Sequence, residues 1–164
     1  MSANQSSSGT AFGNVAGVIA RWLLGTVFIV MGAQKVMHPE LFLKSVRQYE
    51  LFTNPTLLNA IAAGLPWFEV FCGLLLIAGV AVRGTALLLV LMLVPFTVVV
   101  LHRAVGIAGA QGLALCAVKF DCGCGAGEVL ICKKVLENCG FIALACGLLW
   151  GRGRALCARF GVFS

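Results

Sequence analysis

Four long apolar segments dominate this chain and limit the folds open to it. They cover about residues 15–34, 60–82, 85–101 and 135–150. Hydrophobic residues make up 60% of the 164-residue chain and charged residues 11%, whereas charged residues account for about 25% of an ordinary soluble domain. Because about 20 apolar residues suffice for a helix to cross a bilayer, the sequence predicts an all-α integral membrane protein. We expect a bundle of four transmembrane helices formed by residues 15–150.

The segments outside these runs are polar and predict the rest of the organisation. Residues 1–14 are rich in Ser, Asn and Gly and indicate a polar N-terminal tail, and residues 151–164 form a basic C-terminal tail. Within residues 35–59, apolar positions recur at helical spacing, which predicts a short amphipathic interfacial helix in the first loop. Residues 105–118 are apolar but short, and either extend the third helix or re-enter the membrane.

The basic residues predict the orientation of the bundle. The C-terminal tail carries Arg152, Arg154 and Arg159 without an acidic residue, and the second connection adds Arg83. The positive-inside rule then places both termini in the cytoplasm and the two long loops outside it. The net charge of +6 comes from scattered residues with no basic stripe, so the expected partner is the lipid bilayer and not a nucleic acid.

A polar, glycine-rich island carries the most informative chemistry. Cys122 and Cys124 are separated by one glycine and flanked by more. A disulfide across one residue closes a strained ring, and strain makes a disulfide more oxidising. The spacing therefore indicates a redox pair, with a static structural disulfide as the alternative. No second cysteine pair or histidine cluster has zinc spacing, so no metal site is expected.

Other cysteines follow the island at a spacing of seven, namely Cys132, Cys139 and Cys146. Seven residues are nearly two helical turns, which places the three on one helix face. Cys132 lies nearest the island and is a candidate resolving thiol. We interpret Cys72, Cys116, Cys139 and Cys146 as small packing residues.

Two charged residues lie deep within the apolar segments, Arg21 in the first and Glu69 in the second. Intramembrane charges are costly and tend to be paired or functional. Counting residues from the segment ends separates them by only about 7 Å in depth. The pair is either a structural ion pair between two helices or a polar site for a quinone head group or a proton path, and both interpretations stay open.

Ordered motifs add a family resemblance. They read Arg21-x-x-x-Gly25, Gly32-x-x-Lys35-x-x-His38-Pro39, Leu65-Pro66-Trp67-x-Glu69-x-x-x-Gly73-x-Leu75-Leu76 and Phe120-Asp-Cys-Gly-Cys-Gly125. In this order the chain resembles the DoxX-like four-helix membrane proteins, and within them the branch of the methylamine utilisation protein MauE. The resemblance covers about residues 15–150. The branch usually has Cys-Gly-Cys-Phe-Gly at the island, where this chain has Gly125-Ala126-Gly127 after the second cysteine.

The resemblance implies a four-helix bundle in the bacterial inner membrane, and the orientation expected from the basic residues then places the Cys-Gly-Cys loop in the periplasm. The member that names the branch is associated with maturation of methylamine dehydrogenase, whose small subunit is rich in disulfides, and works beside a thioredoxin-like partner. The first hypothesis is therefore a maturation protein that supports thiol–disulfide chemistry on an extracytoplasmic client, a redox relay without an enzyme's usual active site. The alternative is a non-catalytic scaffold subunit of a larger, quinone-linked membrane complex. The chain has no ATP-binding loop, haem motif or nucleophile–base constellation.

Overall fold

The computed structural model describes residues 6–49, 54–121 and 127–150, with side chains from residue 15 onward. In this part of the chain the elements run α1 (Ser6–Met37), α2 (Pro39–Gln48), α3 (Pro55–Ala78), α4 (Val82–Gln111), the 3₁₀-helix η1 (Leu115–Ala117), β1 (Lys119–Asp121), β2 (Glu128–Leu130) and α5 (Ile131–Leu149). The predicted all-α class is therefore confirmed, with one small hairpin added. The helix α1 begins at Ser6, inside the segment assigned above to an N-terminal tail.

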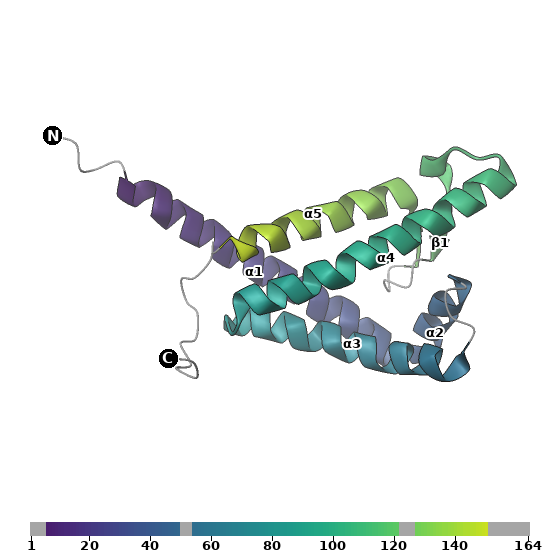
Figure 1. Ribbon diagram of the computed structural model, residues 1–164, viewed down its shortest axis with the longest axis horizontal. Coiled ribbons are helices and arrows are strands. Elements are labelled where there is room, and N and C mark those ends of the chain that lie inside the picture. The colour runs from purple at the N-terminus through teal and green to yellow at the C-terminus, as the bar shows by residue number, and fades with distance from the viewer. Residues whose placement is uncertain (1–5, 50–53, 122–126, 151–164) are drawn as a thin grey trace.

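Three of the described helices are long and apolar enough to cross a membrane, over Val15–Met37, Pro55–Ala78 and Val82–Gln111. The fourth predicted span corresponds to α5, whose first two turns carry Lys133, Lys134 and Glu137. With these three charges, α5 is not one of the helices apolar enough to cross a membrane. The count of four membrane-crossing helices therefore stays a prediction, although α5 packs along α4 as part of the same bundle (Figure 1).

Local sequence signals explain where the helices begin and end. Asn54 caps α3, its side chain accepting a hydrogen bond from the Thr56 amide at 2.9 Å. Gly79 ends α3 in the left-handed conformation at φ 73°, which glycine adopts without steric cost. Gly112 ends α4 in the same way, at φ 63°. The helix α4 thus continues past residue 104 to Gln111, so the first half of the 105–118 stretch extends the third long helix.

The short helix α2 lies in the first long connection, where the sequence predicted one. His38 and Pro39 mark its start, since proline suits the first helical turn. Its inward face buries Phe42 and Ser45. Figure 1 shows α2 at the same end of the bundle as the β1 strand, and Tyr49, just after α2, packs edge-on against Phe120 of β1 with ring centroids 6.4 Å apart. The position of α2 at a membrane interface stays a prediction.

The buried apolar side chains form two clusters along the bundle. One lies between α1, α3, α4 and α5 and includes Leu24, Leu76, Leu89 and Leu148. The other lies where α4 and α5 meet the hairpin, and includes Val100, Val118, Phe120 and Ile131. The second cluster fixes the hairpin to the end of the bundle. Many large apolar side chains remain exposed on the outer helix faces, as expected for a surface that faces lipid.

Candidate functional site

The β1–β2 hairpin holds the ends of the Cys-Gly-Cys island together. Its strands are antiparallel, with Lys119 opposite Leu130 and Asp121 opposite Glu128. Residues 122–127 therefore connect two paired strand ends. Cys122 and Cys124, the predicted redox pair, belong to this connection and lie outside the described residues. In the chain Cys122 directly follows Asp121, the last residue of β1.

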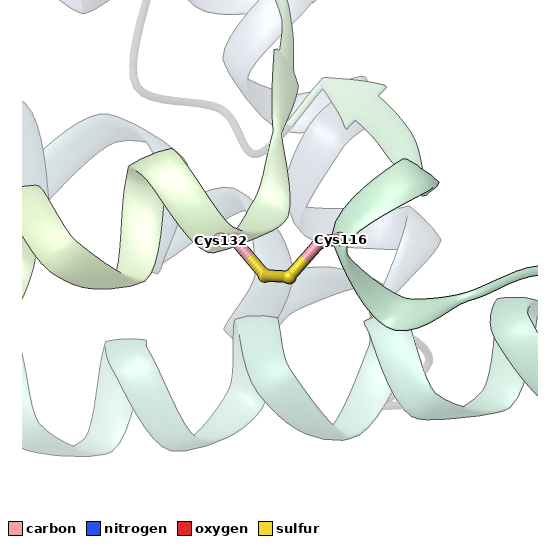
Figure 2. Close-up of a disulfide and its surroundings, with 2 residues drawn as sticks. All are labelled: Cys116 and Cys132. Carbon is pink, nitrogen blue, oxygen red and sulfur yellow. A yellow bond between two sulfur atoms is a disulfide. The ribbon is translucent and has the colours of Figure 1, made fainter.

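A disulfide between Cys116 and Cys132 closes the opposite, open end of the hairpin (Figure 2). Cys116 comes from η1 and Cys132 from the first turn of α5, with their Cα atoms 5.0 Å apart. The bond joins residues 16 positions apart, so it encloses the whole hairpin in a covalent loop. The expectation that Cys116 is only a packing residue was wrong. Its spacing to Cys132, across a polar turn, was the signal that sequence reasoning missed.

The bonded state of Cys132 bears on its predicted role. Its sulfur is bonded to Cys116 and lies beyond Leu130, whereas the Cys122 end of the hairpin begins after Asp121. The strand between these ends spans about 7 Å at about 3.4 Å per residue. A resolving role for Cys132 stays a prediction, and it would require the disulfide to open first.

Glu69 forms a buried ion pair with Lys35. The Lys35 Nζ atom donates to Glu69 Oε1 at 2.6 Å and to Oε2 at 2.7 Å. Both side chains are only 7% exposed. The structure thus supplies Glu69 with a partner from the end of α1, whereas the ion pair considered in the sequence analysis had Arg21 in that place. Each charge satisfies the other in a region where either alone would be costly.

Close contact between α1 and α3 fixes this pairing. A Cβ atom on Gly32 would lie 2.8 Å from the Pro66 carbonyl oxygen and 3.1 Å from the Glu69 Cβ. A Cβ on Gly25 would lie 2.8 Å from the Gly73 carbonyl oxygen. These two contacts lie seven residues apart on each helix, at Gly25 and Gly32 of α1 and at Gly73 and Pro66 of α3. Together they set the antiparallel register. In that register Glu69 lies opposite Gly32, and Lys35 is the basic residue one turn further along α1.

Arg21 lies elsewhere on α1. It precedes Gly32 by 11 residues, which is about 16 Å along a helix. Its side chain is 1% exposed and makes an interaction of its own within the bundle. The structure therefore does not unite Arg21 and Glu69 in one paired unit, and their reading as a joint quinone or proton site stays a prediction.

A further polar cluster joins α4 and α5. The Asn138 Nδ2 atom donates to Thr97 Oγ1 at 3.1 Å, and Thr97 Oγ1 donates to the Leu93 carbonyl at 2.7 Å. Lys134, one turn earlier on α5, is 3% exposed, and its Nζ atom lies 3.6 Å from Glu137 Oε2. The helical spacing of Ile131, Lys134 and Asn138 places all three on the buried face of α5.

A pocket of about 510 Å³ lies between α1, α2 and the hairpin. We call it the hairpin pocket. Its lining residues are Gln34, Lys35, Met37, His38, Leu41, Phe42, Ser45, Asp121 and Gly127. Lys35 stands at its inner end, with Nζ 5.1 Å from the Phe42 ring centroid. Asp121 and Gly127, which line the pocket, are the described residues on either side of the five-residue stretch that contains Cys122 and Cys124.

Comparison with known proteins identifies the family. The family described as methylamine utilisation protein MauE matches residues 13–151, which is most of the chain, and the chain belongs to this family. No curated protein and no solved structure matches the chain. The matched residues include α1 and α3, which carry the Lys35–Glu69 pair, and they also include the hairpin. Membership supports a membrane accessory role in methylamine utilisation.

Proposed function

We propose that this protein is a membrane-embedded maturation factor whose Cys122–Cys124 pair exchanges disulfides with an extracytoplasmic client. Family membership supports the accessory role in methylamine utilisation. The observation that carries the redox step is the Cys116–Cys132 disulfide. It already pins the hairpin covalently at its base. A second cross-link at Cys122 and Cys124 would add little to that restraint, so a structural staple is the weaker explanation for these residues.

The proposed step is a thiol–disulfide exchange that balances without another reactant. A client thiolate attacks one sulfur of the Cys122–Cys124 disulfide and forms a mixed disulfide. The client's second thiolate then attacks its own sulfur in that bond. The client gains one disulfide, and Cys122 and Cys124 leave as thiols with the two electrons and two protons that the client lost. A disulfide-rich subunit of the methylamine dehydrogenase type, or a thioredoxin-like partner, is the expected reaction partner.

The location of the hairpin supports an oxidising compartment. Disulfides persist in the periplasm and are rare in the cytosol, and the Cys116 side chain is exposed at the end of the bundle. The arginine-rich C-terminal tail favours a cytoplasmic position for the opposite end. We therefore place the hairpin on the periplasmic side of the inner membrane, with α5 as the fourth membrane helix and both termini in the cytoplasm.

The test is the redox state of Cys122 and Cys124 in intact cells, read by acid quenching, differential alkylation and mass spectrometry. A mild reductant pulse should reduce the pair, which should reoxidise within minutes. A Cys122→Ser/Cys124→Ser strain should lose client disulfides, whereas Cys139→Ser, which removes an exposed free thiol on α5, should not. A pair that resists the pulse, together with an unchanged client, would favour the scaffold subunit instead.

A further inference from the structure

The hairpin pocket lies at the depth where a membrane ligand would expose its polar end. Four of its lining residues, Gln34, Lys35, Met37 and His38, belong to the last turn of the first candidate span or follow it directly. That span ends at Met37. The volume of about 510 Å³ falls in the range of about 300–1,000 Å³ that small-molecule sites occupy.

The wall of the pocket offers hydrogen-bond donors. Lys35 uses its ammonium group to contact both oxygens of Glu69, and an ammonium has three protons. One proton of Lys35 is therefore left for the pocket. The Gln34 amide adds two donors, and His38 adds a ring N–H. Ser45 spends its hydroxyl proton on the Leu41 carbonyl at 3.0 Å. This wall therefore suits a ligand that accepts hydrogen bonds.

The charges of the pocket favour a neutral ligand over an anion. Glu69 neutralises Lys35 at contact distance, and Asp121 contributes a carboxylate to the rim. A phosphate or carboxylate would approach that carboxylate while Lys35, which lines the same pocket, already has its charge balanced by Glu69. A neutral ligand with carbonyl oxygens meets no such opposition.

The remaining lining is apolar and open on one side. Phe42 is 5% exposed and forms part of the inner wall, whereas Met37 and Leu41 are 64% and 56% exposed. Because the exposed pair lies where α1 leaves its candidate span, an apolar tail could pass between these side chains into the acyl region. The ligand should thus be flat, neutral and lipid-soluble, with carbonyl acceptors at its head.

We propose that the hairpin pocket binds the head group of a membrane quinone, with Gln34, Lys35 and His38 as donors to its carbonyl oxygens. The electron transfer that follows rests on the proposed function. The Cys122 and Cys124 thiols lose two electrons and two protons and form a disulfide, and the quinone gains both and becomes a hydroquinone. Two S–H bonds break, one S–S bond forms, and two O–H bonds form. This step returns the cysteine pair to the state that oxidises a client.

Binding can be tested apart from the thiol chemistry. The full chain carrying Cys122→Ser/Cys124→Ser is reconstituted in lipid nanodiscs and photolabelled with an azidoquinone, with decylubiquinone as competitor. Peptide mapping should place the label within residues 34–45. Loss of one donor in Gln34→Leu should weaken competition about two- to tenfold. Leu41→Trp, at an exposed position, should block the pocket and abolish this labelling.

The control is Lys44→Gln, an exposed position on the outer side of α2 that does not line the hairpin pocket. It should label as the parent does. Label spread over the lipid-facing helices, or unaffected by Leu41→Trp, overturns the proposal, as does displacement by a client peptide but not by decylubiquinone. If the quinone binds while Cys122 and Cys124 stay inert in cells, the proposed function fails and the quinone site stands. If the thiols cycle normally in a Leu41→Trp strain, the quinone step fails and the relay stands.

Discussion

The ion pair between Lys35 and Glu69 gives the sharpest prediction for stability. Replacing Lys35 with Met removes the ammonium but keeps the chain's apolar bulk, and leaves the Glu69 carboxylate buried at 7% exposure. Breaking a buried pair from one side costs about 3–5 kcal/mol, because an uncompensated charge remains. We expect Lys35→Met and Glu69→Leu each to destabilise the folded bundle by that amount.

The double variant separates this explanation from simple loss of packing. With both charges gone, an apolar pair of similar volume should restore stability to within about 1–2 kcal/mol of the parent, since such replacements are often neutral. The two single effects should therefore fail to add by more than about 3 kcal/mol. The assay is reversible unfolding in mixed micelles with increasing SDS, followed by circular dichroism.

The matched control is Lys44→Met, which removes an exposed lysine from α2 and should change the free energy of unfolding by no more than about 0.5 kcal/mol. Two results would refute the reasoning. If the single variants were as stable as this control, the Glu69 carboxylate would not be both buried and ionised. Additive effects in the double variant would mean that Lys35 and Glu69 are not partners.

The remaining predictions concern packing and the hairpin. Gly73→Ala should cost about 1–3 kcal/mol in the same unfolding assay, because its Cβ would lie 2.7 Å from the Gly25 carbonyl oxygen. Gly64→Ala, on the same helix with open space around it, should instead stabilise the bundle by up to about 1 kcal/mol. Equal changes in the free energy of unfolding for the two variants would contradict the close contact between α1 and α3. Cys132→Ser should lower stability by about 3 kcal/mol, as expected for opening a loop of this length, and non-reducing peptide mapping of the parent should recover the Cys116–Cys132 link. Asn138→Ala should cost about 1 kcal/mol through its lost hydrogen bond to α4, and an unchanged unfolding midpoint would contradict that contact.

The sequence could predict the class of the fold because lipid leaves few alternatives for a long apolar segment. Runs at residues 15–34, 60–82 and 85–101 correspond to the three described spans, with shifts of several residues at their ends. The end of α4 was harder to assign, since His102 and Arg103 end the apolar run whereas the helix continues through them. Its actual stop at Gly112 depends on a left-handed glycine cap, which hydropathy does not register.

The partner of Glu69 could not be obtained from depth alone. Depth counts assume that two helices enter the membrane at matching levels, whereas the register of α1 against α3 is set by where their backbones touch. The printed sequence did contain that information, since Gly25 and Gly32 share the spacing of Gly73 and Pro66. In the structure these two intervals match in antiparallel order, and the partner that Glu69 finds on α1 is Lys35.

The disulfide was missed for a different reason. Cys116 lies in an apolar stretch and Cys132 at a helix start, so each was assessed within its own segment. Only the hairpin, three residues per strand, brings the two segments together. Strands this short have too few residues for an alternating pattern to be visible in the sequence.

The pairing of Lys35 with Glu69 also has a consequence for how the chain enters the membrane. The segment that becomes α3 carries a carboxylate whose partner lies on α1, the helix made before it. If that segment entered the lipid alone, its unpaired carboxylate would have to be buried in the bilayer, which is costly, or the segment would remain at the translocon. With α1 alongside, the Lys35 ammonium can pair with the carboxylate at once, and the glycine contacts between α1 and α3 let the two backbones pack closely around the pair. Membrane integration of the second span is thereby tied to the first, and the two are expected to leave the insertion machinery as one unit.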